Sequence, residues 1–270
     1  MDILHTKYDA LRNRLQELGS LAVAFSGGVD STFLLRVAHD VLGERALAVT
    51  AAPPFVPGRE QKEASDFCRE AGIRQIVIPA DALVIDSIRH NPPDRCYHCK
   101  RMIFGRILEA AEEAGISHVA EGSNTDDTGD YRPGMRAIRE LGVLSPLLDA
   151  GLSKADIRAL SKELALSTWD KPSFACLASR FVYGEAIMDE RLSMVDRAEQ
   201  LLLDLGFRQF RVRIHGDLAR IEILPEDFDR IMTPAVRERI TAELKEYGFS
   251  YVTLDLSGYR TGSMNEVLKR

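Results

Sequence analysis

The sequence predicts an α/β protein, with a doubly wound and mainly parallel sheet followed by a smaller α+β domain. Between residues 21 and 122, short apolar runs alternate with longer amphipathic stretches, a pattern typical of parallel strands joined by helices. After Pro172 this alternation ends, and a helix is followed by two strands around a tight turn. The 270 residues suffice for one large domain and a small partner. We therefore expect a first domain at residues 1–180 and a second at 181–270.

The elements of the first domain follow from hydrophobic periodicity and from the residues that end each pattern. Short apolar runs predict buried strands over 21–25, 46–52, 73–80 and 117–122. Amphipathic periodicity predicts helices over 4–18, 32–43, 57–72, 100–115 and 152–164. Pro57 and Gly72 suit the two ends of one helix, Gly43 suits the end of another, and Ser153 is a good N-cap.

The second domain reads as α-β-β-α-α-β. We expect a helix over 188–207, then two strands within 210–224 that are joined by a His-Gly-Asp turn. Two further helices, over 225–232 and 234–248, precede a last strand over 249–256.

Composition excludes several classes of protein. The apolar content of 45% is too high for a disordered chain, and no apolar run approaches the ~20 residues of a membrane span. The charged N-terminus lacks the apolar stretch of a secretory signal. With 35 basic and 41 acidic residues the net charge is −6, which disfavours a nucleic acid as the main partner. We expect a cytoplasmic homo-oligomer.

The motif SGGVDS at residues 26–31 lies where a strand gives way to a helix, so backbone amides and the helix dipole favour an anion there. The predicted phosphate ligands are Ser26, Gly27, Gly28, Ser31 and Thr32. Asp30 would face phosphate through a bridging Mg²⁺. Asn124 follows the strand expected over 117–122 and lies at the carboxyl edge of the sheet, where ligands bind in such folds. Thr50, within the strand expected over 46–52, is a further predicted ATP ligand. The plainer alternative is a glycine-rich turn without a ligand.

The motif differs from both the Walker pattern and GxGxxG, and it resembles the PP-loop of ATP pyrophosphatases. That resemblance implies a fold like that of the adenine nucleotide alpha hydrolases and an activity that forms an adenylate and releases pyrophosphate. The superfamily includes enzymes that transfer ammonia and enzymes that transfer sulfur.

The four cysteines divide into two kinds. Cys68 lies in a helical pattern and is most simply a core residue. Cys96 and Cys99 form a CxxC motif that can reach one metal, and Cys176 could add a third thiolate from far along the chain. Three thiolates fit a cluster with one open iron better than a closed zinc site. Incidental thiols and a zinc site are the alternatives.

Five segments resemble the LarE family over essentially the whole chain: SGGVDST, DYRPGMRA, ACLASRF, RVRIHGDLARIE and YVTLDLSGYRTGSMN. The resemblance implies an ATP-dependent sulfurtransferase of nickel-pincer nucleotide cofactor biosynthesis. Such an enzyme adenylylates the carboxylates of pyridinium-3,5-biscarboxylic acid mononucleotide, releases pyrophosphate, and replaces AMP by sulfur. A thiolate is a suitable nucleophile for that second step at neutral pH.

The family has two sulfur sources, and the resemblance implies one of them for Cys176. In one form this cysteine gives up its own sulfur and becomes dehydroalanine. In the other it holds a 4Fe–4S cluster together with a CxxC pair, and the open iron carries a transferable sulfide. The presence of Cys96 and Cys99 favours the cluster form, with ATP, Mg²⁺ and the cluster as cofactors and a separate sulfide donor as partner. Sacrificial transfer from Cys176 stays open.

The resemblance also implies roles for charged residues. Arg180, Arg211, Arg213 and Lys100 would bind the anionic nucleotide substrate, and the two arginines of RVR should share one face of a strand. Glu199 would be catalytic beside Cys176, through proton transfer or metal contact. The alternatives are a solvated helix face for Glu199 and a surface position for Lys100.

Three other functions compete. A PP-loop tRNA thiolase can also hold three cysteines, but it should carry a basic RNA-binding surface. An ammonia-transferring synthetase has no need of Cys176, and a nucleotide-binding module would release no pyrophosphate.

Overall fold

The computed structural model describes residues 2–129, 133–172, 175–260 and 262–265. The chain divides into two compact units. The first unit comprises residues 1–82 and 94–174, and the second comprises 83–93 and 175–270. The first three residues of the segment DYRPGMRA lie outside the described residues.

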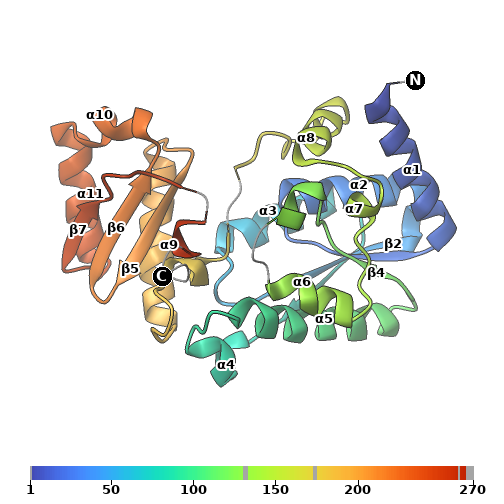
Figure 1. Cartoon of the computed structure of the whole chain (residues 1–270), viewed down its shortest axis with the longest axis horizontal. Helices are drawn as coiled ribbons and strands as arrows, with labels where there is room; N and C mark the ends of the chain where they lie inside the picture. Colours follow the sequence, from blue (N-terminus) through green and yellow to red (C-terminus); the bar gives the residue numbers. More distant parts are fainter. Residues whose placement is uncertain (1, 130–132, 173–174, 261, 266–270) are drawn as a thin grey trace. The chain divides into compact units, whose positions relative to one another are not determined.

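A parallel four-stranded sheet forms the centre of the first unit (Figure 1). Its strands are β1 (Leu21–Ala24), β2 (Ala46–Ala52), β3 (Gln75–Pro79) and β4 (Val119–Ala120). They lie in the order β3-β2-β1-β4, and Ala22 of β1 pairs with both Leu47 and Val119. This arrangement confirms the predicted parallel sheet.

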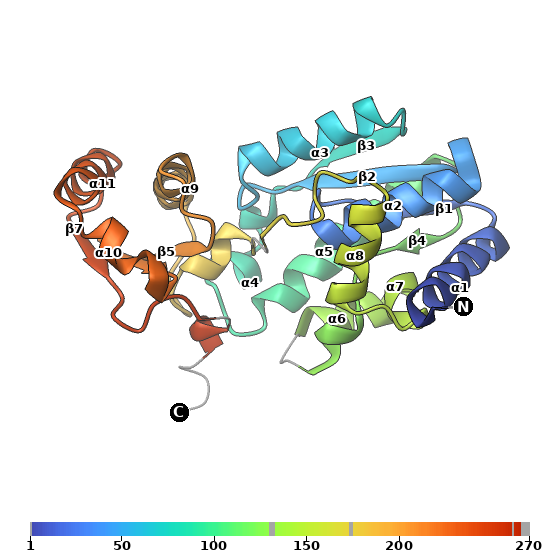
Figure 2. The same cartoon turned by 90° about the horizontal axis from the view of Figure 1, so that it is seen from above.

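Seven helices are described in the first unit. They are α1 (Ile3–Leu18), α2 (Val29–Leu42), α3 (Gly58–Glu70), α5 (Arg95–Glu113), α6 (Pro133–Glu140), α7 (Pro146–Asp149) and α8 (Lys154–Glu163). Alternate residues of β1 enter two different cores, because successive side chains of a strand point to opposite faces. Leu21 and Val23 pack with α1, α2, α3 and α8, whereas Ala22 packs with α5 and α6. The sheet is therefore covered on both faces, as a doubly wound fold requires (Figure 2).

The second unit is built on a three-stranded sheet in the order β5-β6-β7. β5 (Phe210–His215) and β6 (Leu218–Ile223) form the predicted antiparallel hairpin, and β7 (Tyr251–Leu254) lies parallel to β6. Its helices are α4 (Asp86–Arg89), α9 (Asp189–Asp204), α10 (Phe228–Ile231) and α11 (Pro234–Glu246). The sequence predicted this order of elements, apart from the short α4.

The main difference from the predicted elements lies at the CxxC motif. The helix expected over 100–115 begins at Arg95, so Cys96 and Cys99 lie in its first turns. Residues 95–99 lack a clear apolar period, but Arg95 and Tyr97 are buried, and the Tyr97 hydroxyl donates to Glu140 of α6 at 2.6 Å. Packing against α6 therefore extends the helix beyond its apolar pattern.

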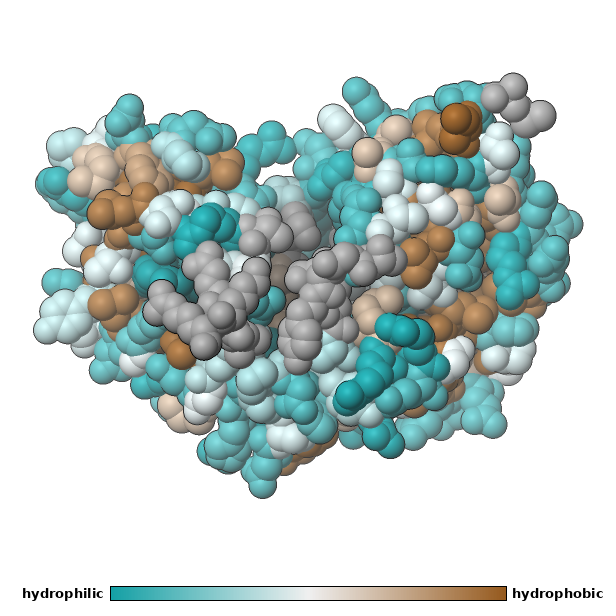
Figure 3. Space-filling view, viewed as in Figure 1, coloured by the Kyte–Doolittle hydropathy of each residue, from teal (hydrophilic) through white to brown (hydrophobic). Residues whose placement is uncertain are grey.

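The molecular surface shown in Figure 3 mixes hydrophilic side chains with small, separate groups of apolar ones. Among the described helices, none combines the length and the apolar character needed to cross a membrane.

Candidate functional site

The glycine-rich loop of the SGGVDS motif connects the end of β1 to the start of α2. Gly27 has φ of +71°, a conformation that favours glycine, and a Cβ there would lie 3.2 Å from the Cβ of Ala64 on α3. Gly28 is the N-cap of α2, and no side chain caps the helix at this end. The backbone amides of the first turn are therefore available to an anion.

The loop hydroxyls predicted to bind phosphate lie together. Ser26 Oγ is 3.0 Å from Ser31 Oγ, and Ser31 donates to the carbonyl of Gly28 at 3.2 Å. Thr32 is fully buried, and its Oγ1 has no hydrogen-bond partner within the described parts of the chain. The structure thus brings three hydroxyls to the N-terminal turn of α2.

Asp30 is held by two side chains from later in the sequence. It forms an ion pair with Lys154 at the start of α8, and its Oδ1 accepts a hydrogen bond from Asn124 Nδ2 at 3.2 Å. Gly122 makes this approach possible, because a Cβ there would lie 3.1 Å from the Cβ of Asp30. The structure therefore brings the predicted residues Asp30 and Asn124 together and adds Lys154, which the sequence analysis missed.

A second missed residue, Lys171, also contacts the loop. Its ammonium donates to the carbonyl of Gly27 at 3.1 Å and to the carboxylates of Glu60 and Glu63 on α3, at 2.7 Å each. Because these partners lie more than 100 residues away in the sequence, no local pattern could reveal them.

Two other predicted residues of the first unit contact neighbouring elements of that unit rather than the loop. Thr50 is buried at the end of β2, and its hydroxyl accepts from Gln75 Nε2 of β3 at 2.9 Å. The stem of Lys100 lies across α6, where a Cβ on Gly134 would be 2.7 Å from Lys100 Cδ. Lys100 is half-buried, so it is not a fully solvated surface lysine.

The four cysteines lie in different environments. Cys68 is buried, and burial raises the pKa of its thiol to about 12, which confirms a core residue without nucleophilic character. Cys96 is exposed and Cys99 half-buried on α5, and Arg95 Nη2 lies 3.6 Å from Cys96 Sγ. Cys176 is half-buried and belongs to the second unit.

No cluster of three potential metal-ligating side chains occurs in the described ranges. Cys96 and Cys99 nevertheless offer two thiols of the kind that binds iron or zinc. Cys96 and Cys99 are three residues apart on one helix, so both thiols project on the same side, and both retain access to solvent.

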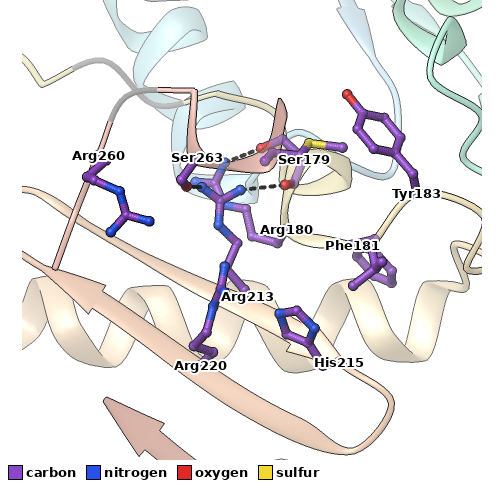
Figure 4. A pocket seen from close by; sticks show the side chains of 11 residues that line it. Ser179, Arg180, Phe181, Tyr183, Arg213, His215, Arg220, Arg260 and Ser263 are labelled. Atoms are coloured by element: carbon purple, nitrogen blue, oxygen red, sulfur yellow. Dashed lines mark hydrogen bonds between the residues drawn. The ribbon is translucent and has the colours of Figure 1, made fainter. Parts of the chain in front are cut away.

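The second unit contains a cavity of about 240 Å³. Its lining begins at Ser179, three residues after Cys176 in the sequence. The end of the 3₁₀ turn η4 (Leu177–Arg180) and residues 181–183 line the cavity, together with β5, β6 and a C-terminal segment that contributes Arg260, Ser263 and Met264 (Figure 4). Four arginines line the cavity: Arg180, Arg213, Arg220 and Arg260. Burial and the charge of Arg220 lower the pKa of His215, also in the lining, so its imidazole is neutral at pH 7.

Arg180 is almost fully buried and forms a bidentate ion pair with Glu199 of α9, with both N–O distances 2.8 Å. Its Nη1 also donates to the carbonyls of Ala175 and Cys176, at 2.8 and 3.2 Å. The guanidinium thereby fastens the turn that carries Cys176 onto α9.

Glu199 has no exposed surface, so its alternative as a solvated helix residue is wrong. Burial alone would raise the pKa of Glu199, but the charge and hydrogen bonds of Arg180 and the amide of Val212 outweigh it and hold the pKa below its ordinary value. The carboxylate is therefore ionised and fully engaged.

Arg213 and Arg220 share a second buried carboxylate. Arg213 donates twice to Glu222 at 3.1 Å, and Arg220 donates to it at 2.9 Å. Arg213 also reaches the carbonyl of Ser179 and the hydroxyl of Ser263, at 2.7 and 2.8 Å (Figure 4). This network ties η4, the hairpin and the C-terminal segment into one wall of the cavity.

Arg211 is buried but is not part of the cavity lining. Its guanidinium lies 5.1 Å from the ring centre of Tyr259. Burial lowers the pKa of Arg211 to about 10, and the nearby charge of Arg180 adds to the shift. The two arginines of RVR therefore have different surroundings: Arg211 lies near Tyr259, whereas Arg213 lines the cavity and pairs with Glu222.

Comparison with known proteins gives similarities that extend over the full chain. No protein-family model matches. The chain is 40% identical over 272 residues to the pyridinium-3,5-bisthiocarboxylic acid mononucleotide synthase of Lactiplantibacillus plantarum, covering 100% of this chain and 98% of that protein. It is 25% identical to a glutamine-hydrolyzing GMP synthase chain of Thermoplasma acidophilum, over 90% of this chain and 80% of that protein. It is 28% identical to the tRNA-specific 2-thiouridylase MnmA of a Picosynechococcus species, over 57% of this chain and 53% of that protein.

Proposed function

Because the chain belongs to the LarE family, that of the pyridinium-3,5-bisthiocarboxylic acid mononucleotide synthases within the PP-loop superfamily, we propose that it is an ATP-dependent sulfurtransferase. Its substrate is pyridinium-3,5-biscarboxylic acid mononucleotide, whose carboxylates become thiocarboxylates on the route to the nickel-pincer nucleotide cofactor. The observation that carries this proposal is the position of η4: Cys176 is its N-cap, and Ser179 and Arg180 at its other end line an arginine-rich cavity.

The first unit activates the carboxylate. A carboxylate oxygen of the substrate attacks the α-phosphorus of ATP, the bond from that phosphorus to the bridging oxygen breaks, and pyrophosphate leaves. The free amides at the start of α2 and the hydroxyls of Ser26 and Ser31 stabilise the negative charge on the phosphates. Asp30 and Asn124 supply the oxygen atoms that Mg²⁺ prefers, so these residues would hold the ion beside the phosphates.

The second unit holds the phosphate of the substrate. Four arginines line the cavity, while Glu199 and Glu222 neutralise part of their charge, and a cationic excess suits a phosphate monoester. Arg213, Arg220 and Arg260 would contact the phosphate. Arg180 and Glu199 would instead act as positioning residues, because the bonds of Arg180 go to Glu199 and to the turn of Cys176.

The sulfur step requires a nucleophile at the mixed anhydride. A sulfur atom attacks the acyl carbon, and AMP leaves with the oxygen that came from the carboxylate. We propose that Cys96, Cys99 and Cys176 hold a 4Fe–4S cluster, with three thiolates as ligands and one iron left open. A bound cluster would supply the transferable sulfide, and a separate sulfide donor would replace it. Sacrificial use of the Cys176 sulfur is the competing route.

Pyrophosphate release tests this function. With ATP and Mg²⁺, we expect release that depends on pyridinium-3,5-biscarboxylic acid mononucleotide and that weakens with the corresponding nucleoside, which lacks the phosphate. Arg260→Met should raise the KM for the mononucleotide about tenfold, since a charge-assisted hydrogen bond is worth about 1.5–3 kcal/mol. Arg237→Met, on the exposed face of α11, is the matched control and should leave KM unchanged.

Two outcomes contradict the proposal. Release that depends on tRNA and not on the mononucleotide identifies a tRNA thiolase. An absence of release with any carboxylate substrate identifies a nucleotide-binding module.

A further inference from the structure

Lys154 occupies a fixed position beside the PP-loop. It is the first residue of α8 and directly follows the N-cap, Ser153. The Ser153 hydroxyl accepts a hydrogen bond from the amide of Asp156 at 3.2 Å, and the Asp156 carboxylate accepts one from the amide of Ser153 at 3.0 Å. The amide of Lys154 also donates to Asp126 at 3.2 Å. The capping box and the bond to Asp126 fix the backbone at the start of α8. The Lys154 ammonium therefore reaches Asp30 from a well-ordered helix terminus.

The contacts around Asp30 form a closed polar ring within the first unit. Lys154 pairs with Oδ2 of Asp30, and Asn124 donates to Oδ1. Asn124 in turn accepts from the amide of Asp126 at 3.0 Å, and Asp126 accepts from Lys154. Both oxygens of Asp30 are therefore engaged within the protein itself.

A divalent cation bound by Asp30 would lie next to the ammonium of Lys154. Two positive charges bound to the same carboxylate repel each other strongly. Solvent screens this repulsion only in part, because 29% of the Lys154 side chain and 22% of the Asp30 side chain are exposed. Lys154 and a divalent cation consequently compete for the same carboxylate.

We propose that Lys154 is a positioning residue that serves as the counter-ion of Asp30 before ATP binds and gives up that carboxylate when Mg²⁺ arrives with the nucleotide. The negative charge of the triphosphate then offers the ammonium a new partner. In this scheme the ATP-free protein binds a divalent cation weakly, so metal and nucleotide enter together. The inference rests on the proposed function only in taking ATP and Mg²⁺ as reactants.

Binding of Mn²⁺ to the full-length, ATP-free protein tests the proposal, with free Mn²⁺ measured by electron paramagnetic resonance. We expect Lys154→Met to bind Mn²⁺ about tenfold more tightly than the parent protein, because the substitution removes one partly screened positive charge beside the metal site. The gain should vanish in Asp30→Asn/Lys154→Met, which places the new affinity at Asp30. A loss of structure would weaken binding, whereas the proposal requires it to strengthen.

Lys7→Met is a closely matched control. Lys7 pairs with Asp156 of the same helix at 2.7 Å, with side-chain exposures of 30% and 24%. If freeing any half-buried carboxylate were enough, this variant would gain Mn²⁺ affinity to the same extent. An equal gain in Lys7→Met, or no gain in Lys154→Met that retains its thermal transition, overturns the proposal. Neither readout involves a sulfur acceptor, so the proposed function can fail while this inference stands.

Discussion

Replacing Cys176 by alanine is expected to reduce sulfur transfer to background while pyrophosphate release continues. The thiol is needed under either sulfur source, as a cluster ligand or as the donated atom. The carbonyl of Cys176, rather than its thiol, accepts from Arg180, so the substitution leaves the turn and the cavity intact. The measurement follows pyrophosphate and thiocarboxylate in the same reaction.

Cys68→Ala is the control for this experiment, because Cys68 is a buried core thiol in the first unit. It should transfer sulfur at the parental rate. Full sulfur transfer by Cys176→Ala would contradict the account, because sulfur would then reach the substrate without a thiol at this position.

Glu199→Ala is expected to lower the free energy of unfolding by about 3–5 kcal/mol, because it leaves Arg180 buried without its counter-ion. The amide of Val212 also loses an acceptor at 3.0 Å. Urea unfolding at pH 7 measures the change. Glu199→Gln serves where the alanine variant does not fold, since it retains the shape and part of the hydrogen bonding.

The pH dependence of this contribution has a defined sign. The pKa of Glu199 lies below the ordinary value of 4.5 in the folded protein, so its stabilisation is complete above pH 4.5 and is lost as the pH falls through the lower folded value. Glu199→Gln should remove that part of the acid sensitivity.

Glu243→Ala is the matched surface comparison for Glu199→Ala. Glu243 pairs with Arg239 at the same 2.8 Å, but on the exposed side of α11. Its removal should change stability little, because solvent screens exposed pairs. Equal losses in the free energy of unfolding for the two substitutions would show that burial of the Arg180–Glu199 pair does not increase the cost of removing its carboxylate.

Much of the first unit could be predicted because its signals are local. The apolar runs of β1 and β2 are buried strands, and Gly27 and Gly28 stand where the chain needs a positive φ and an uncapped helix end. The N-cap at Ser153 was also predicted from the sequence, and the structure confirms it and adds the reciprocal bond of a capping box. These features depend on neighbours within a few residues.

The remainder of the site depends on contacts between distant residues. Lys154 lies 124 residues from Asp30, and Lys171 lies 111 residues from Glu60, so neither pair leaves a periodic signal. Glu199 looked like a candidate for a solvated helix face, because sequence alone does not show that Arg180 comes from another turn to neutralise it. The start of α5 was missed for a similar reason, since α6 supplies the partner of Tyr97.

The most direct test of the central claim, that sulfur reaches an adenylylated carboxylate from a cluster rather than from Cys176, is mass spectrometry of product and protein after anaerobic turnover. The protein should be brown and hold about four irons per chain before the reaction. The account predicts a product in which sulfur replaces a carboxylate oxygen, together with a Cys176 of unchanged mass. A product without sulfur, or a Cys176 lighter by the mass of hydrogen sulfide in a colourless protein, would contradict it.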